Sequence, residues 1–512
     1  MKRFLTLLIA ALALSAGLQA QVYNPHNATE GDILADIEAY IEDGMELWNI
    51  PGTAISIIKD NQVVYAKGFG VKDVTNPTDL VNERTCFKIA SVSKAFTPVI
   101  IAQLVDEGKL GWDDKVKDLL PGFKLKDKFA NDNFRVKDLF CHWSGLPRQA
   151  GTHFANLGFS NKDMLKLTAN LNPAYSFRSD FRYNTMFYSV SALLVEKVTG
   201  MSWEENLRVR ILQPLGMSET STGSAGLLAA TNRAQSHTAE YTLGKIEVQA
   251  IPYEHQPLHR LTEISSAGAI ISNVTDMAKW LAFQMGDGTV NGKRLVSKKQ
   301  MAEIHKGVSI AKQEDDVLTL YGYGWYVEQS TKGRLYWHTG SSYGHTAICG
   351  WLPDLNLGFM ISTNTDGGAG FRRAIMRRII DLYLGYPDHD YCAEEYASFV
   401  KAEQERGFKS LSDAKEVKYQ TPLEPMKVVG VYENPVLGKA AVTSEDEGVL
   451  FITIGPLGWK HELESVNGNE FLFESDGYIF KATFNLNKKG EKVESMSVDL
   501  GNGEDFGVWK KR

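Results

Sequence analysis

The feature that most constrains this fold is a series of strands joined by very short links between residues 322 and 363. Apolar stretches at 324–327, 335–338, 346–351 and 358–363 predict four strands, and the links at 330–333 and 353–356 hold only a few residues each. A link this short cannot carry a crossover, so neighbouring strands must run antiparallel. The chain is therefore expected to build an antiparallel sheet.

Helices and one further hairpin are predicted around this sheet. Apolar residues recur at helical spacing around 30–48, 91–107, 272–285 and 371–384, which predicts amphipathic or buried helices. Residues 53–59 and 62–69 alternate like two strands that turn at Asp60-Asn61. Residues 110–250 are mostly helical and rich in loops. An antiparallel sheet flanked by helices corresponds to an α+β fold.

The pattern changes towards the C-terminus. Residues 388–422 are charged and are interpreted as a connector. After about residue 424, short alternating strands are expected at 428–432, 450–454, 471–473, 478–484 and 493–500, which is typical of a small all-β barrel or sandwich. The predicted divisions are therefore 21–387 for the main domain, 388–422 for the connector and 423–512 for the β domain. A structural or substrate-gating role is expected for the last.

The first residues read as a targeting signal. Lys2 and Arg3 precede an apolar run at 4–14, and small residues continue to Ala20. This is the layout of a secretory signal peptide over residues 1–20, and the run is too short to span a bilayer. The mature protein is expected to be exported, periplasmic or secreted, without stable membrane insertion.

Charge and cysteine content exclude several classes of function. Asp and Glu number 62 against 55 Lys and Arg, for a net charge of −7, so no nucleic acid is expected as a partner. Four widely spaced cysteines fit neither a metal cluster nor a dense disulfide framework, and sequence cannot choose among their three possible pairings. Free, buried thiols are expected at these positions: Cys86, Cys141, Cys349 and Cys392.

Ser91 and Lys94 form the strongest candidate for catalysis. A Lys three residues after a Ser lies on the same helix face and can accept the hydroxyl proton, which activates the Ser for attack on a carbonyl. The spacing alone is weak, because it recurs at Ser56, in a predicted strand, at Ser309, among polar loop residues, and at Ser398 and Ser412, in the connector.

Context separates Ser91 from the other four serines. Only Ser91 opens an apolar helix, where its hydroxyl meets the positive end of the helix dipole and its N–H can face an oxyanion. A serine that merely caps the helix would occupy the same place. Pro98 lies inside this helix and removes the hydrogen bond that the Lys94 carbonyl would accept, so a kink is expected beside the base.

Two further motifs make the pattern specific. The stretch Phe87-Lys88-Ile89-Ala90-Ser91-Val92-Ser93-Lys94 resembles the first motif of class C β-lactamases and their penicillin-binding relatives, which include D,D-peptidases, D-aminopeptidases and esterases. Tyr183-Asn184-Thr185 resembles the second motif and His338-Thr339-Gly340 the third, with a family landmark at 140–147. The resemblance covers about residues 30–385. It implies a sheet flanked by helices, with a helical subdomain.

The resemblance also implies roles and needs no cofactor. Ser91 would form an acyl-enzyme, and Lys94 and Tyr183 would share the general-base work. The backbone N–H groups of Ser91 and Ser341 would form the oxyanion hole. Substrate would be bound by four residues: Thr185, His338, Thr339 and Gly340.

Two departures from the family pattern bear on the substrate. Thr185 stands where the family has Asn, and a hydroxyl reaches less far than an amide. His338 stands where many members have a Lys, and a largely neutral His is a poor partner for a substrate carboxylate. Both favour an esterase or broad acyl hydrolase acting on a small ester, amide or peptide. Acyl transfer to an alcohol or amine, and a non-catalytic binding module on a hydrolase scaffold, stay open as alternatives.

Two other patterns are interpreted as coincidental. Gly340-Ser341-Ser342-Tyr343-Gly344 matches Gly-x-Ser-x-Gly, but a strand rather than the required helix is predicted after Ser342. His255 and His259 have the spacing of zinc-binding helices, but Pro257 lies between them, and no metal is assigned. The sequence predicts no oligomeric state.

Overall fold

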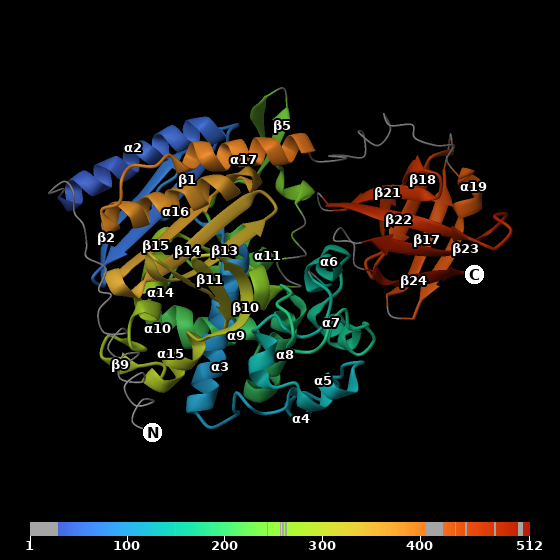
Figure 1. Ribbon diagram of the computed structural model, residues 1–512, viewed down its shortest axis with the longest axis horizontal. Helices are drawn as coiled ribbons and strands as arrows, with labels where there is room; N and C mark the ends of the chain where they lie inside the picture. The colour runs from blue at the N-terminus through green and yellow to red at the C-terminus, as the bar shows by residue number, and fades with distance from the viewer. Residues whose placement is uncertain are drawn as a thin grey trace, which may run out of the picture.

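The computed structural model describes residues 29–148, 150–242, 244–256, 258, 261, 264–405, 423–435, 437–445, 448–475, 478–499 and 505–512. The predicted signal peptide lies outside these residues. Figure 1 shows a large body of strands and helices with a second, all-β unit beside it.

The centre of the large body is an eight-stranded antiparallel sheet of order β10-β11-β12-β13-β14-β15-β1-β2. The four strands predicted between 322 and 363 are confirmed as β12 to β15. The strands are β1 (Gly52–Lys59), β2 (Gln62–Gly70), β10 (Gly307–Glu314), β11 (Val317–Gly322), β12 (Tyr326–Ser330), β13 (Gly333–Ser342), β14 (His345–Leu352) and β15 (Leu357–Thr363).

Strands β10 and β11 were not predicted, and the placement of Ser309 in a polar loop is wrong. Ser309 lies in β10, where its hydroxyl donates to the Cys141 carbonyl at 2.7 Å. The strand forms the edge of the sheet and most of its side chains are exposed or half-buried, so its sequence lacks the apolar run that marks the central strands.

The predicted hairpin at Asp60-Asn61 is confirmed. Strand β1 pairs with β2 from Gly52–Gly70 to Lys59–Gln62. Asp60 and Asn61 both have positive φ, 51° and 63°, which is the backbone that a two-residue type I′ turn requires and that Asp and Asn tolerate.

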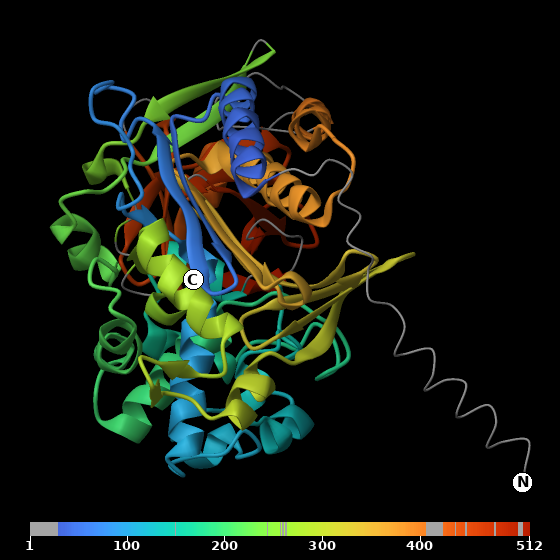
Figure 2. The same cartoon turned by 90° about the vertical axis from the view of Figure 1, so that its left-hand side faces the viewer.

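Helices cover both faces of the sheet, as Figures 1 and 2 show. On one face lie α2 (Glu30–Trp48), α16 (Ala369–Leu384) and α17 (Tyr391–Glu405), and on the other lie α3 (Phe96–Asp106) and α14 (Val274–Met285). Along β1, Ala54 and Ile58 belong to the core on the α14 side, while Ile55 and Ile57 belong to the core on the α16 side. Burial of both faces fixes this strand at the centre of the molecule.

The helical subdomain, on the α3 side of the sheet, completes the large body. It includes a three-stranded sheet of order β3-β7-β4, made of Phe87–Lys88, Ile270–Ser272 and Ser221–Thr222. Its helices are α4 (Val116–Leu119), α5 (Lys128–Asn133), α6 (Ala150–Asn156), α7 (Asn161–Thr168), α8 (Met186–Thr199), α9 (Trp203–Leu207), α10 (Gln213–Leu215), α11 (Gly223–Ala229), α13 (Ser265–Gly268) and α15 (Lys298–Ile304). One small hairpin accompanies them, β8–β9 (Thr289–Val290 and Lys293–Arg294). A second hairpin, β5–β6 (His237–Thr242 and Lys245–Ala250), packs on the side of the sheet that carries α2 and α17.

The C-terminal all-β domain is a nearly closed barrel. Its nine-stranded sheet has the order β19-β18-β17-β16-β24-β23-β22-β21-β20. The five predicted strands are present, and four shorter or more polar ones were missed. A short helix, α19 (Pro425–Val428), precedes the strands: β16 (Gly430–Asn434), β17 (Gly438–Ser444), β18 (Leu450–Ile454), β19 (Trp459–Glu462), β20 (Glu464–Asn467), β21 (Glu470–Ser475), β22 (Tyr478–Leu486), β23 (Val493–Asp499) and β24 (Asp505–Lys511).

The β domain touches the helical subdomain at the end of α6. The turn between β18 and β19 packs there so tightly that a Cβ on Gly158 would lie 2.5 Å from Leu457, and one on Gly455 would lie 2.2 Å from the Leu157 carbonyl. The missing side chains of these two glycines therefore allow the contact. Part of the predicted connector is helical: α17 packs on α16, where Arg373 pairs with Glu395 at 2.5 Å.

Cysteine state and membrane-spanning potential complete the description. All four cysteines are free and buried, as predicted. Within the described ranges, no helix combines the length and the hydropathy needed to cross a bilayer.

Candidate active site

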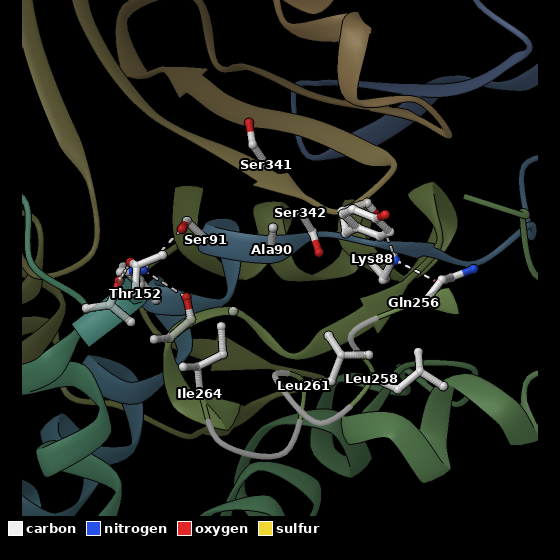
Figure 3. A pocket seen from close by; sticks show the side chains of 15 residues that line it. Lys88, Ala90, Ser91, Thr152, Gln256, Leu258, Leu261, Ile264, Ser341 and Ser342 are labelled. Atoms are coloured by element: carbon white, nitrogen blue, oxygen red, sulfur yellow. Dashed lines mark hydrogen bonds between the residues drawn. The ribbon is translucent and has the colours of Figure 1, made fainter. Parts of the chain in front are cut away.

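A small pocket of about 50 Å³ lies where the loop before α3 meets the end of β13 (Figure 3). It brings together residues that are far apart in the sequence. Its lining residues are Lys88, Ala90, Ser91, Lys94, Thr152, Thr185, Gln256, Leu258, Leu261, Ile264, Ala267, Gly268, Ser341, Ser342 and Tyr343.

Ser91 and Lys94 lie in one short 3-10 helix (Ala90–Ala95), which leads directly into α3. In a 3-10 helix the side chains at i and i+3 eclipse each other, so this geometry brings the two groups closer than an α-helix would. The Lys94 Nζ donates to Ser91 Oγ at 3.1 Å and to the Ala267 carbonyl at 2.9 Å. Pro98 falls in the first turn of α3, where its missing N–H leaves no intrahelical partner unsatisfied.

The backbone just before Ser91 is strained. Ala90 has φ +47°, a left-handed conformation that costs an L-residue about 1–2 kcal/mol. The neighbouring strand fits closely against this bend: a Cβ on Gly340 would lie 2.1 Å from the Ile89 carbonyl oxygen. The third motif therefore needs a glycine, because only glycine lets β13 approach the Ser91 loop.

Burial sets the ionisation of Lys94. The side chain is 1% exposed, and desolvation lowers the pKa of its ammonium to about 7. A substantial share of Lys94 is therefore a neutral amine at neutral pH. A neutral amine 3.1 Å from a hydroxyl can accept its proton.

Tyr183 faces the same amine. The Lys94 Nζ lies 5.0 Å from the Tyr183 ring centroid, and the His142 ring packs against Tyr183 at 4.3 Å. Among the described residues no atom is within hydrogen-bonding geometry of the Tyr183 hydroxyl, yet Ser91 lies near enough to lower the pKa of that phenol slightly. Burial has the larger effect and raises the pKa of Tyr183 well above its usual value, so the resting phenol is protonated.

His338 lies behind the pocket wall, not on it. The side chain is 1% exposed, its Nε2 lies 3.0 Å from the Tyr321 hydroxyl and its Nδ1 lies 2.6 Å from the Thr339 carbonyl. Burial, aided by the nearby charge of Lys94, lowers the pKa of His338 to about 3. The imidazole is therefore neutral at pH 7, with Nδ1–H donating to Thr339 and Nε2 accepting from Tyr321.

The rest of the third motif is placed as follows. Thr339 is half-buried and Gly340 is buried against the Ser91 loop. From β13, the pocket is lined by the next two residues, Ser341 and Ser342. The Ser342 side chain turns into the pocket, whereas the Ser341 side chain turns away from it (Figure 3).

The second motif contributes Thr185 to the pocket and Asn184 to the framework. Thr185 Oγ1 lies 2.9 Å from Thr152 Oγ1, a residue of α6. Asn184 is buried and donates to the Pro147 carbonyl at 2.8 Å while accepting from the Met186 N–H at 2.8 Å. The amide of Asn184 thereby fixes the landmark loop to the start of α8.

Several pocket residues were not predicted as site residues, among them Thr152, Lys88 and Gln256. Lys88 is 2% exposed, and its Nζ donates to the Tyr343 carbonyl at 2.7 Å and to Gln256 Oε1 at 3.2 Å. Lys88 stands inside the first motif, and a charged residue amid apolar neighbours was the available signal. Thr152 and Gln256 carry no local signature.

The two patterns interpreted as coincidental stay outside the chemistry. Ser342 is the last residue of β13 and is followed by a turn and β14, not by a helix. His255 is exposed in a short 3-10 turn, and His259 lies outside the described residues. In the part of the chain that the structure describes, no group of three His, Cys, Asp or Glu is arranged to hold a metal ion.

Comparisons with known proteins agree with this architecture. A family profile described as "Beta-lactamase" matches residues 37–384. The chain is 23% identical to the "Unguisins hydrolase ungD'" of Aspergillus campestris over 80% of this chain and 78% of the relative. It is 26% identical to "Protein flp" of Staphylococcus aureus over 65% of this chain and 63% of that protein, which is less than two thirds of the relative's length.

Solved structures share the fold over nearly the whole chain. The octameric penicillin-binding protein homologue from Pyrococcus abyssi superposes with a TM-score of 0.60 at 23% identity, covering 93% of this chain and 100% of that one. SurE, whose crystal structure was solved with D-Leu, superposes with a TM-score of 0.55 at 18% identity, covering 94% and 100%. The similarity therefore includes the C-terminal β domain as well as the main body.

Proposed function

Because the chain belongs to the β-lactamase family, we propose that it is a serine hydrolase that cleaves a small ester or amide through an acyl-enzyme on Ser91. The observation that carries the proposal is the 3.1 Å contact between Lys94 Nζ and Ser91 Oγ. This contact places the nucleophile beside an amine, and burial lowers the pKa of that amine to about 7. A perturbed amine beside a serine in a pocket is the arrangement that nucleophilic catalysis requires.

The proposed first step is acylation. The neutral Lys94 amine accepts the Ser91 hydroxyl proton while Ser91 Oγ attacks the substrate carbonyl carbon. The carbonyl oxygen becomes an oxyanion, which the N–H groups of Ser91 and Ser341 stabilise. The Tyr183 phenol, held protonated by burial, donates a proton to the leaving oxygen or nitrogen as the bond to it breaks.

The second step removes the acyl group. The Lys94 ammonium first returns its proton to the Tyr183 phenolate, so that the amine is neutral again. Water then attacks the acyl carbon and loses a proton to Lys94, and this proton passes to Ser91 Oγ as its bond to the acyl carbon breaks. The structure favours Lys94 over Tyr183 as the base in the free enzyme. Burial lowers the pKa of Lys94 and raises the pKa of Tyr183, so both shifts favour the neutral form. A neutral amine can accept a proton, whereas a neutral phenol is already protonated.

The proposed substrates carry a small, partly apolar acyl group. Leu258, Leu261 and Ile264 form one side of the pocket, opposite Ser341 and Ser342 (Figure 3). The third motif supplies a neutral imidazole and no fixed cation, which favours esters over substrates bound through a carboxylate. The names of the relatives add unguisins and amides of D-Leu to the compounds to test.

The test is intact mass after exposure to a fluorophosphonate. Wild type should gain one adduct, Ser91→Ala should gain none, and the matched variant Ser342→Ala should react like wild type. An unreactive, folded wild type would favour a non-catalytic binding module, and a reactive Ser91→Ala would place the nucleophile elsewhere. Turnover of esters, amides and β-lactams, with and without an added alcohol, then separates hydrolysis from acyl transfer.

Export is part of the same proposal. N-terminal sequencing of protein secreted from cells expressing the full chain should begin at Gln21, which follows the predicted cleavage after Ala20. A product that retains Met1 in the secreted fraction would contradict it.

A further inference from the structure

A buried arginine stands directly behind the oxyanion-hole strand. Arg372, in the first turns of α16, is 4% exposed. One terminal nitrogen donates to the Gly340 carbonyl and, at 2.8 Å, to the Ala347 carbonyl, and the other donates to Ser341 Oγ at 3.3 Å. Gly340 and Ala347 are direct partners in the β13–β14 ladder. The guanidinium therefore fixes both strands at one point, beside Ser341.

A second buried arginine on the same helix, Arg378, differs from Arg372 in its ion pairs. Arg378 is 5% exposed and is neutralised by two carboxylates, Asp36 at 2.7 Å and Asp388. No carboxylate of the described chain lies within ion-pair distance of Arg372, whose contacts are carbonyls and a hydroxyl. Burying a charge without a counter-ion is costly, so the charge at 372 calls for a compensating function.

That charge persists at neutral pH. Burial lowers the pKa of the Arg372 guanidinium to about 9, which still leaves it protonated at pH 7. Because the surroundings are desolvated, its field is screened less than a surface charge would be. A permanent positive charge consequently lies on the far side of the strand from Ser91.

The peptide that Arg372 contacts is the one that carries the second oxyanion donor. The Gly340 C=O and the Ser341 N–H belong to the same peptide unit, and in a trans peptide they point in opposite directions. A cation bound to the C=O polarises the unit and strengthens the N–H as a donor. The Ser341 side chain points away from the pocket (Figure 3) and contacts Arg372, whereas Gly340 lies against the Ser91 loop.

We propose that Arg372 is a positioning residue of the oxyanion hole, which holds the Gly340–Ser341 peptide in place and supplies positive charge to the developing oxyanion. This inference rests on the proposed acyl-enzyme function. The close fit of Gly340 to Ile89 explains why placement matters: a shift of the strand changes its distance to Ser91 directly, and misplacement of about 1 Å can cost a hundredfold in rate.

The test compares an ester with its thionoester in three variants. Sulfur accepts hydrogen bonds poorly, so the ester-to-thionoester ratio of kcat/KM reports on the oxyanion hole. Arg372→Gln should lower kcat for the ester about tenfold to a hundredfold, leave KM nearly unchanged and reduce the ratio. Arg372→Lys, which keeps the charge, should recover part of both. The matched variant Arg378→Gln should lower the melting temperature without changing the ratio.

Each outcome bears on a different claim. A ratio that is the same in Arg372→Gln, Arg378→Gln and wild type overturns the inference, and so does a loss confined to KM. If Arg372→Gln does not fold, the ester-to-thionoester ratio of Arg372→Lys tests the inference instead. A guanidinium that only stabilised the fold would leave this ratio at the wild-type value, which would overturn the inference. A wild type that a fluorophosphonate does not label overturns the proposed function, and the inference with it.

Discussion

The two β-sheets of this molecule differ in what they bury. Beside the main sheet, desolvated ionisable groups converge on one place, including Lys94, His338 and Arg372. Inside the C-terminal barrel the buried side chains are mostly aliphatic, together with aromatic pairs such as Phe473 stacked on Phe480 at 5.2 Å. Among the described residues of the barrel, the buried polar residue is Asn434. A packed apolar interior stabilises a fold, whereas shifted pKa values in a pocket mark a site for chemistry.

The comparison predicts that buried ionisable groups beside the main sheet support activity but lower the stability of the fold. Lys94→Met should lower kcat/KM about a thousandfold or more by removing the base, yet raise the melting temperature, because it removes a buried amine. The folded pKa of this amine, about 7, lies below the unfolded value. The stabilisation should thus be greatest below pH 7 and shrink as the pH rises towards 10.

Calorimetry across pH 6–10 on wild type and Lys94→Met measures this effect. Lys197→Met, at an exposed position of α8, is the matched control and should change neither activity nor stability. A Lys94→Met protein that melts below wild type at pH 6 would mean that the amine stabilises the fold, and the contrast between the two sheets would fail.

The next largest effect is expected where β13 meets the Ser91 loop. Gly340→Ala places a methyl group 2.1 Å from the Ile89 carbonyl, so the strand or the loop must move. A loss of about a hundredfold in kcat is expected for such a displacement. Gly31→Ala, whose Cβ would meet only Thr29 Oγ1 at 3.6 Å, is the control for kinetics. Wild-type turnover by Gly340→Ala would show that the close approach is dispensable.

The pH profile is a milder test of the same site. Only the neutral Lys94 amine accepts a proton, so kcat/KM should fall about tenfold per pH unit below about 7 and level off above it. Thermal unfolding recorded in the same buffers separates loss of the base from loss of the fold. A rate that stays constant from pH 5 to 8 would exclude Lys94 as the base.

The barrel should show the reverse behaviour, with the smallest effect on catalysis. Phe473→Ala should destabilise the C-terminal domain by about 3–5 kcal/mol while kcat/KM stays at the wild-type value, since the ring lies inside the barrel and not among the residues that line the pocket. Urea unfolding with a probe in each domain measures both. Val431→Ala, at a position 42% exposed, should change neither the stability of the C-terminal domain nor kcat/KM. Loss of activity in Phe473→Ala would show that the barrel supports the site, through the contact of Leu457 with the end of α6.

The sequence predicted the residues of the site better than their surroundings. Ser91, Lys94 and Tyr183 could be predicted because each belongs to a short motif, and the order of the motifs can be read along the chain. The burial of His338 depends on Tyr321 from β11, an edge region without apolar alternation. Arg372 looks like any other basic residue in an Arg-rich helix, and only packing distinguishes it from Arg373 beside it. Contacts between distant elements leave no periodic signal in either partner.

The pairing of β1 with β15 has a consequence for how the chain is made. Ile55 lies opposite Ile361, about 300 residues later, so the sheet cannot close until most of the protein has been synthesised. At roughly 5–20 residues per second, the β1–β2 hairpin waits tens of seconds with one apolar edge unpaired. Such an edge is a template for association with other chains. The time that synthesis takes therefore sets how long this edge of β1 stays open to other chains.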